Sequence, residues 1–214
     1  MASLPALPRR YHTASIWLLY ALGLVPAAYG FWLGATGQLP GNPVKEFEHL
    51  LGLWALRFLV ATLAVTPVRD LFGINWIRYR RALGLLAFWY VLMHFLTYMV
   101  LDQYLNFSAI LVDIAKRPFI TIGMAAFVML IPLALTSNAW SIRKLGPRWG
   151  KLHRLVYVIA AAGALHFAMS VKVVGPEPLI YIGLVLLLLL WRPIRPRFNR
   201  WKRGHDPLLR HGRA

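Results

Sequence analysis

The sequence predicts an all-α membrane protein, a bundle of six transmembrane helices, and three observations support this fold class. Hydrophobic residues make up 59% of the 214 residues, well above the share usual in soluble domains. They gather in six long runs, and many aromatic residues stand at the edges of these runs, as in the belt at a membrane surface. The runs lack the alternating pattern of a membrane barrel, so each is expected to be a helix that satisfies its own backbone.

Each run has roughly the 20 residues that a helix needs to cross the hydrocarbon core. The first run follows Arg9 and Arg10 and has no clean small-residue cleavage site after it, so we interpret it as an uncleaved span rather than a signal peptide. The sixth run, PLIYIGLVLLLLLW, is short but almost uninterrupted. The predicted spans are residues 14–34, 48–67, 82–101, 119–136, 153–171 and 178–191.

The positions of Lys and Arg predict the orientation of these spans. Nineteen of the 24 basic residues fall in the termini and loops on one side, four fall on the other side, and Arg57 falls within a span. Because loops rich in Lys and Arg stay on the cytoplasmic side of a membrane, we expect both termini to be cytoplasmic. Topology and contact with the lipid surface then explain the net charge of +17, and nucleic-acid binding is not expected.

The chain is expected to form one membrane domain, residues 1–195, followed by a basic cytoplasmic tail, residues 196–214. After Trp191 the sequence is rich in Arg and Pro, which predicts disorder or a position on the lipid surface. No segment is long enough for a nucleotide-binding domain, so an electron donor or substrate must come from another molecule or from the membrane. Cysteine is absent from the sequence, which excludes disulfides, iron–sulfur clusters and thiol catalysis.

Histidines are the residues on which the prediction of function depends. His94 lies in the third run, and His153 and His166 lie in the fifth. Ionisable residues inside a membrane are costly and indicate function, and interhelical hydrogen bonding explains one such histidine better than three. Haem binding, a proton relay and plain packing are the three interpretations. The other four histidines are expected to be solvated or interfacial: His12, His49, His205 and His211.

Counting along the helices favours haem. The third and fifth runs cross the membrane in the same direction, so His94 and His166 are expected at a similar depth, where two neutral imidazoles can hold a haem iron from both sides. His153 precedes His166 by thirteen residues, about 20 Å along a helix, and so lies near the inner face. Thirteen residues also turn a helix about 140° out of alignment. Either the helix is irregular near Gly163, or a second group enters from the flank.

Two arginines are further candidates for contact with a cofactor. Arg80 precedes His94 by fourteen residues, almost four turns, and therefore shares its face near the depth of His153. A haem near His153 could be five-coordinate, capped by water, or bound by Arg80 as its sixth ligand, although a charged arginine is a poor ligand. Topology and contacts with lipid phosphate or a haem propionate are the plainer explanations of this arginine. Arg57 lies in the middle of the second run and needs an anionic partner, which could be a cofactor propionate or phosphate, or a carboxylate elsewhere in the chain.

Other classes of function compete with a haem-based electron conduit. A transporter or proton channel with a histidine relay would need carboxylates in the spans, yet of the seven Asp and Glu residues only Glu48 and Asp102 approach a run. A structural scaffold would give a colourless preparation. A cytochrome b that anchors a quinol-linked oxidoreductase in the membrane is a close alternative. It would differ from a haem-based electron conduit of another kind only in its partner protein.

Four motifs in order resemble one known family. RYRRALGLLAFWYVLMH, KRPFITIGMAAF, PLALTSNAWSIRKLG and RWGKLHRLVY together are similar to the haem-binding membrane subunits of periplasmic methionine-sulfoxide reductase systems. That family belongs to the ferric-reductase-like transmembrane superfamily, together with the NADPH oxidases. The resemblance runs from about residue 10 to residue 195.

The resemblance implies a six-span inner-membrane protein that carries one or two haem b groups, with FMN as a further cofactor. It implies an electron-transfer subunit that passes electrons from the quinone pool or a cytosolic flavin reductase to MsrP, a periplasmic molybdopterin enzyme that repairs oxidised methionine. His94 and His166 match the family's two ligands of the outer haem, and His153 matches the histidine of the inner haem. Arg80 stands where the oxidases carry another histidine.

Overall fold

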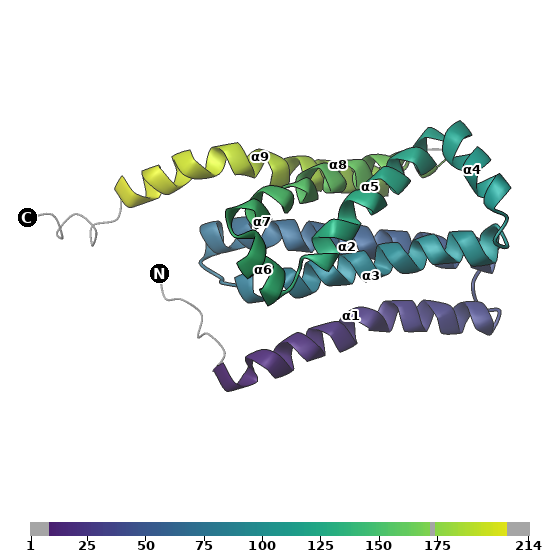
Figure 1. Ribbon diagram of the computed structural model, residues 1–214, viewed down its shortest axis with the longest axis horizontal. Helices are drawn as coiled ribbons and strands as arrows, with labels where there is room; N and C mark the ends of the chain where they lie inside the picture. The colour runs from purple at the N-terminus through teal and green to yellow at the C-terminus, as the bar shows by residue number, and fades with distance from the viewer. Residues whose placement is uncertain (1–8, 172–173, 205–214) are drawn as a thin grey trace, which may run out of the picture.

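The computed structural model describes residues 9–171 and 174–204, and these are helical apart from turns and loops (Figure 1). Six segments are long and apolar enough to cross a membrane, which confirms the predicted number and order of spans. Most extend several residues beyond the predicted runs, because the helices continue into their polar flanks. The six are His12–Ala35, Pro43–Phe72, Ile77–Asp102, Pro118–Leu135, Pro147–Ser170 and Pro176–Trp201.

Four of the spans are single helices and two are composite. The single ones are α1 (His12–Ala35), α2 (Pro43–Phe72), α5 (Pro118–Leu135) and α9 (Pro176–Gly204). The third span joins a 3-10 turn (Ile77–Tyr79), α3 (Arg80–Leu96) and a π-helical turn, η3 (Thr97–Asp102). The fifth joins α7 (Pro147–Leu152) and α8 (Leu155–Ser170). Outside the spans lie a 3-10 turn (Arg9–Tyr11), α4 (Phe107–Lys116) and α6 (Ala139–Leu145).

Asparagine side chains begin three of the helices. Asn42 accepts hydrogen bonds from the N–H groups of Val44 and Lys45 at the start of α2, at 3.0 and 3.2 Å. Asn106 and Asn138 accept in the same way at the starts of α4 and α6. These side chains satisfy N–H groups that a helix leaves without an internal partner, and so they set where each helix starts.

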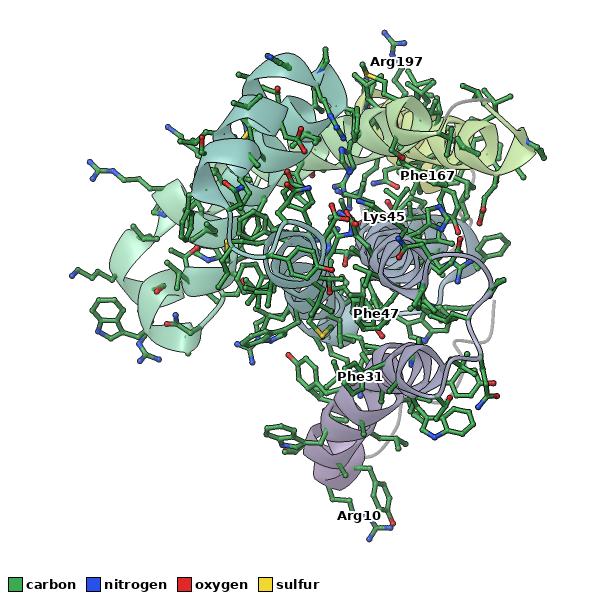
Figure 2. All side chains as sticks on the ribbon, turned by 90° about the vertical axis from the view of Figure 1, so that its right-hand side faces the viewer. Arg10, Phe31, Lys45, Phe47, Phe167 and Arg197 are labelled. Atoms are coloured by element: carbon green, nitrogen blue, oxygen red, sulfur yellow. The ribbon has the colours of Figure 1, made fainter. Side chains whose placement is uncertain are left out.

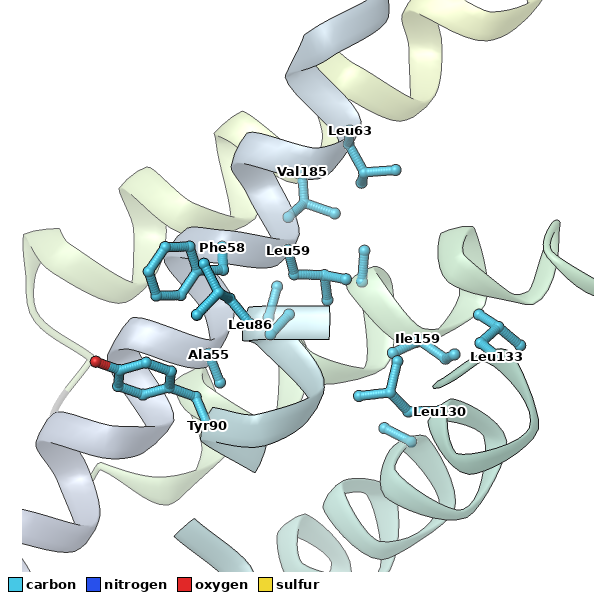
Figure 3. Packing of buried hydrophobic residues seen from close by; sticks show 14 of the residues in the cluster. Ala55, Phe58, Leu59, Leu63, Leu86, Tyr90, Leu130, Leu133, Ile159 and Val185 are labelled. Atoms are coloured by element: carbon cyan, nitrogen blue, oxygen red, sulfur yellow. The ribbon is translucent and has the colours of Figure 1, made fainter. Parts of the chain in front are cut away.

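The core forms where α2 and α3 pack against α5, α8 and α9 (Figure 3). The α2 span is the most buried of the six, and α1 lies along one edge of the bundle, against α2 and α3 (Figure 1). The core side chains are almost all aliphatic, and they include Leu59, Leu63, Leu86, Leu130, Ile159 and Val185. In lipid, such packing positions helices by shape, because hydrocarbon outside is as apolar as the core itself.

One stripe of α3 attaches this helix to α1. Leu86 fills the space beside Gly23, where an added Cβ would lie only 2.6 Å from its Cδ1 atom. One turn later, the hydroxyl of Tyr90 accepts from Ala27 N at 3.1 Å and donates to the Gly23 carbonyl at 2.7 Å. These backbone groups would bond each other in a regular helix, so the hydroxyl is inserted into the ladder of α1, next to Pro26.

Two parts of the chain differ from the sequence prediction. α4 was not expected; it is a short helix between the third and fourth spans. The sixth span was expected to end at residue 191 and to be followed by disorder or by a segment on the lipid surface, and α9 instead continues as a helix to Gly204 despite Pro193 and Pro196. Ring contacts of Phe198 with Trp191 and Trp201 accompany this extension. The rest of the predicted tail, residues 205–214 with His205 and His211, lies outside the described residues.

Replacing Tyr90 with Phe is expected to lower the free energy of unfolding by about 0.5–1.5 kcal/mol, the usual worth of a buried hydrogen bond. Thermal unfolding in detergent measures this change. Tyr29→Phe is the matched control, since Tyr29 lies on α1 with 57% of its surface exposed. Equal midpoints for the two variants would show that the hydroxyl does not stabilise α1.

Candidate functional site

His94 on α3 and His166 on α8 face each other across the bundle. Their ring centres lie 6.2 Å apart, and the ring planes are inclined by 83°. The two helices run in the same direction and each histidine lies near the end of its helix, so the structure brings together the pair that counting along the spans placed at one depth.

A backbone carbonyl fixes each of the two rings. His94 Nδ1 lies 2.8 Å from the carbonyl oxygen of Glu48 on α2, and His166 Nδ1 lies 2.7 Å from that of Phe119 on α5. A carbonyl can only accept, so each Nδ1 carries the proton and donates. The other nitrogen of each ring, Nε2, then keeps its lone pair, which is the arrangement found in histidines that bind metals.

A glycine makes room for each ring, and sequence reasoning missed both glycines. A Cβ on Gly52 would lie 3.2 Å from the His94 ring, and a Cβ on Gly123 would lie 2.7 Å from His166 Nδ1. Each glycine follows the carbonyl acceptor of the same ring by four residues and so lies on the same face one turn later. The imidazole can therefore approach the backbone closely enough to reach the carbonyl. The sequence does contain a signal for both positions, because a glycine inside an apolar run can mark a close approach of another group to the helix backbone.

The two rings line a cavity of about 770 Å³ between α2, α3, α5 and α8. This volume falls within the range of about 300–1,000 Å³ that is usual for cofactor sites. Its wall is mostly aliphatic and aromatic, as expected of a space for a flat apolar group. The lining includes Leu56, Leu59, Val91, Phe95, Met124, Phe127, Leu130, Ile159 and Phe167.

Charged residues collect at one end of this cavity, where Figure 2 looks onto the bundle and labels Lys45 and Phe167. Lys45 Nζ lies 2.7 Å from Asp102 and 3.3 Å from Glu48. Arg117 forms an ion pair with Asp113 at 3.1 Å. The π-helical turn after α3 ends at Asp102 and so brings this carboxylate to α2. The cavity thus has an apolar interior and a polar rim.

The donor set fits haem better than a bare metal ion. A metal–nitrogen bond of about 2 Å on each side of an iron places two axial imidazole centres about 6 Å apart, close to the observed separation of His94 and His166. The described part of the chain has no group of three or more His, Cys, Asp or Glu side chains that could hold a metal ion. A haem iron needs only two ligands from the protein, because the porphyrin supplies four.

His153 lies elsewhere, and its ring does not line the cavity. Its Nε2 is 3.0 Å from the hydroxyl of Thr136, and its ring stacks on Trp149 at 3.9 Å. The helix is interrupted at His153 and Arg154, between α7 and α8, whereas α8 runs unbroken past Gly163. Of the two alternatives, an irregular helix near Gly163 is not found, and the interruption lies at His153 itself.

The two candidate arginines also lie outside the cavity lining. Arg80 Nη2 donates to the hydroxyl of Thr66 on α2. Arg57 Nε donates to the hydroxyl of Tyr181 at 2.9 Å, and its Nη2 lies 3.7 Å from Glu177. The anionic partner that Arg57 required is thus a carboxylate of the chain.

The expectation that only Glu48 and Asp102 approach a span is corrected. Glu177 lies in the first turn of α9, and Asp70 lies buried near the end of α2. Both helices extend beyond the apolar runs from which the spans were predicted, and this extension brings these two carboxylates and Glu46 inside the helices. His49, which was expected at the membrane interface, lines the cavity, and its ring centre lies 5.7 Å from that of Phe167.

Comparison with known proteins gives consistent relatives. Residues 51–164 match the family described as "Ferric reductase like transmembrane component". The chain is 73% identical, over the whole of both chains, to the "Protein-methionine-sulfoxide reductase heme-binding subunit MsrQ" of Rhizobium meliloti (strain 1021). It is 68% identical to the protein of that name from Brucella anthropi, over 87% of this chain and 85% of the relative. It is 65% identical to the protein of that name from Brucella ovis, over 91% of this chain and 87% of the relative. No solved structure matches the chain.

Replacing Gly123 with Ala is expected to displace the His166 ring and to lower the free energy of unfolding by about 1–3 kcal/mol, because the added methyl group overpacks the site. Imidazole ¹⁵N NMR in detergent reports the loss of the Nδ1 hydrogen bond, and thermal unfolding reports the stability. Gly84→Ala is the control, since its Cβ would meet only Thr62 Cγ2, at 3.8 Å. The role given to Gly123 is wrong if both variants behave alike.

Proposed function

Because this chain belongs to the ferric reductase like transmembrane family, and within it to the MsrQ haem-binding subunits of protein-methionine-sulfoxide reductase, we propose that it conducts electrons across a membrane on haem b held by His94 and His166. A bound haem supplies one-electron chemistry at its iron. The observation that supports this proposal most directly is the pair of imidazoles, which are each fixed through Nδ1, lie 6.2 Å apart between ring centres and line one apolar cavity.

The residues of the chain perform three tasks in this proposal. The carbonyl groups of Glu48 and Phe119 hold the rings in one tautomer and orientation. The aliphatic and aromatic wall keeps water from the group and so influences its reduction potential. Lys45 and Arg117, which pair with Asp102 and Asp113 at the rim, would share their charge with carboxylate substituents of the porphyrin.

We confine the proposal to one haem. A second haem at His153 and Arg80 would need groups that the chain already uses, because His153 Nε2 meets Thr136 and Arg80 donates to Thr66. Among the described histidines, His94 and His166 are the two that face each other across one cavity.

The proposed electron path runs from the cytoplasmic side to the periplasm. With both termini cytoplasmic in a bacterial inner membrane, the rim of the cavity faces outward, close to a periplasmic acceptor. We propose MsrP, the molybdopterin enzyme that reduces methionine sulfoxide, as this acceptor. Quinol or a cytosolic flavin reductase is the proposed donor, with FMN as a further cofactor whose position we do not assign.

The alternatives are less well supported by the site. A proton relay through the membrane needs a chain of titratable groups along the spans, but the described carboxylates lie near the two ends of the bundle. The cytochrome b anchor of another quinol-linked oxidoreductase would use the same haem site. It would differ from the proposal only in its soluble partner.

His94→Ala and His166→Ala are each expected to lower haem per purified polypeptide by at least about tenfold and to abolish the low-spin Soret spectrum, since one axial ligand is lost. Pyridine haemochrome assays and visible spectra measure both, and flavin analysis on the same samples tests FMN. His49→Ala is the matched control, because His49 lines the same cavity and its ring packs against Phe167. A colourless wild-type protein, purified from cells supplied with porphyrin, would contradict the proposal.

Reporter fusions are expected to show three outer loops and a cytoplasmic C-terminus. Alkaline phosphatase, which is active only in the periplasm, should be active when fused within residues 36–42 or 103–106, because the loops rich in Lys and Arg remain inside. A fluorescent protein that folds in the cytoplasm should be bright after residue 204. The opposite pattern would reverse the proposed direction of electron flow while leaving the haem site intact.

A further inference from the structure

Four arginines gather at the end of the bundle opposite the rim of the cavity. Arg69 lies on α2, Arg80 begins α3, and Arg192 and Arg195 lie three residues apart on one face of α9. Arg80 interacts electrostatically with each of the other three. Their helices are joined here by two contacts, from Arg80 to Thr66 and from Arg195 to Asp70.

One carboxylate serves two members of this arginine cluster. Asp70, only 5% exposed at its side chain, meets Arg69 Nη2 at 2.8 Å and Arg195 Nε at 2.6 Å. The other carboxylates that the structure describes lie toward the opposite end, in Glu46, Glu48, Asp102, Asp113 and Glu177.

Arg80 and Arg192 are the members whose partners are neutral. Arg80 donates to the hydroxyl of Thr66, and the guanidinium of Arg192 lies over the ring of Tyr157 at 4.7 Å. Within residues 9–171 and 174–204, the structure places no carboxylate within ion-pair distance of either guanidinium. Both side chains are half-buried. Partly desolvated like charges raise the free energy of the bundle unless an anion lies among them.

Two further N–H groups at this end of the spans are buried without an acceptor among the described residues. They are Nη1 of Arg78, two residues before Arg80, and Nε1 of Trp191, next to Arg192. A buried donor without a partner costs free energy comparable to a lost hydrogen bond, so an acceptor from outside the chain is expected near these residues.

We propose that the arginine cluster binds a phosphate group, supplied by the head group of an anionic phospholipid. The planar fork of arginine matches two phosphate oxygens at once, and a phosphate offers more acceptors than a carboxylate. The position agrees with this source: Arg192 follows Pro176 by sixteen residues, about 24 Å along α9, so the cluster lies where the hydrocarbon core ends. This site shares no residue with the proposed haem cavity.

Native mass spectrometry of the full chain, released from micelles that contain phosphatidylglycerol or phosphatidylcholine, tests the proposal. Retention of phosphatidylglycerol is expected to exceed that of phosphatidylcholine, and to fall about tenfold in Arg80→Gln and in Arg192→Gln. Arg81→Gln is the matched control, since Arg81 is the exposed neighbour of Arg80 and carries the same charge. Arg80→Lys and Arg192→Lys, which keep the charge but lose the fork, should retain an intermediate amount. Size-exclusion profiles confirm that each variant is folded.

Two added arms identify the source of the anion. If millimolar inorganic phosphate displaces the retained lipid, the cluster takes free phosphate as well; if the lipid persists, the head group is the occupant. Equal retention by the wild type and all three glutamine variants would overturn the proposal, since unspecific charge would then explain the binding. Retention that falls as haem content rises would overturn it too, because the cluster would then serve a porphyrin carboxylate. The spectrum of Arg192→Gln, expected to equal that of the wild type, keeps this test separate from the haem proposal.

Discussion

Two hydrogen bonds from imidazole N–H groups to backbone carbonyls determine how this bundle can work. The carbonyl groups of Glu48 and Phe119 belong to α2 and α5, which carry neither His94 nor His166. Each bond therefore joins the helix of one of these histidines to a neighbouring helix and also orients the imidazole ring. The bonds form only because Gly52 and Gly123 leave the backbone uncovered one turn later. The site is therefore built twice from the same local arrangement, once on α2 and once on α5.

The bundle separates its charges toward its two ends. Near the histidine pair, Lys45 meets two carboxylates and Arg117 meets one, so both cations at the rim of the cavity are paired. At the opposite end, four arginines gather near the buried carboxylate of Asp70, which pairs with two of them, Arg69 and Arg195. The first arrangement suits a redox group that must accept and release charge; the second suits a permanent negative surface. The amino-acid composition gives only the net charge of +17, from which this separation of charges between the two ends cannot be seen.

The sequence predicts the spans well because backbone groups in lipid must form their hydrogen bonds within the segment, which requires a helix. Apolar runs of sufficient length can be recognised without any knowledge of packing. The equal depth of His94 and His166 follows from counting residues along parallel-running helices. What counting does not provide is which faces meet. The partnership of Arg57 with Glu177 joins residues 120 positions apart, and the break at His153 depends on its contacts with Thr136 and Trp149. Gly52 and Gly123 needed the position of a ring on another helix to be recognised.

The stripe of α3 that carries Leu86 and Tyr90 ends, one turn further, at His94. Leu86 and Tyr90 hold this stripe against α1, while His94 is bonded to α2, so the rotation of α3 about its axis is fixed at three successive turns. Such rigidity bears on the reorganisation energy of electron transfer, the cost of moving surrounding atoms when charge arrives. If His94 holds a haem as proposed, dipoles and side chains that are already in place would need little rearrangement at that moment, so a rigidly held histidine would favour rapid electron transfer in both directions.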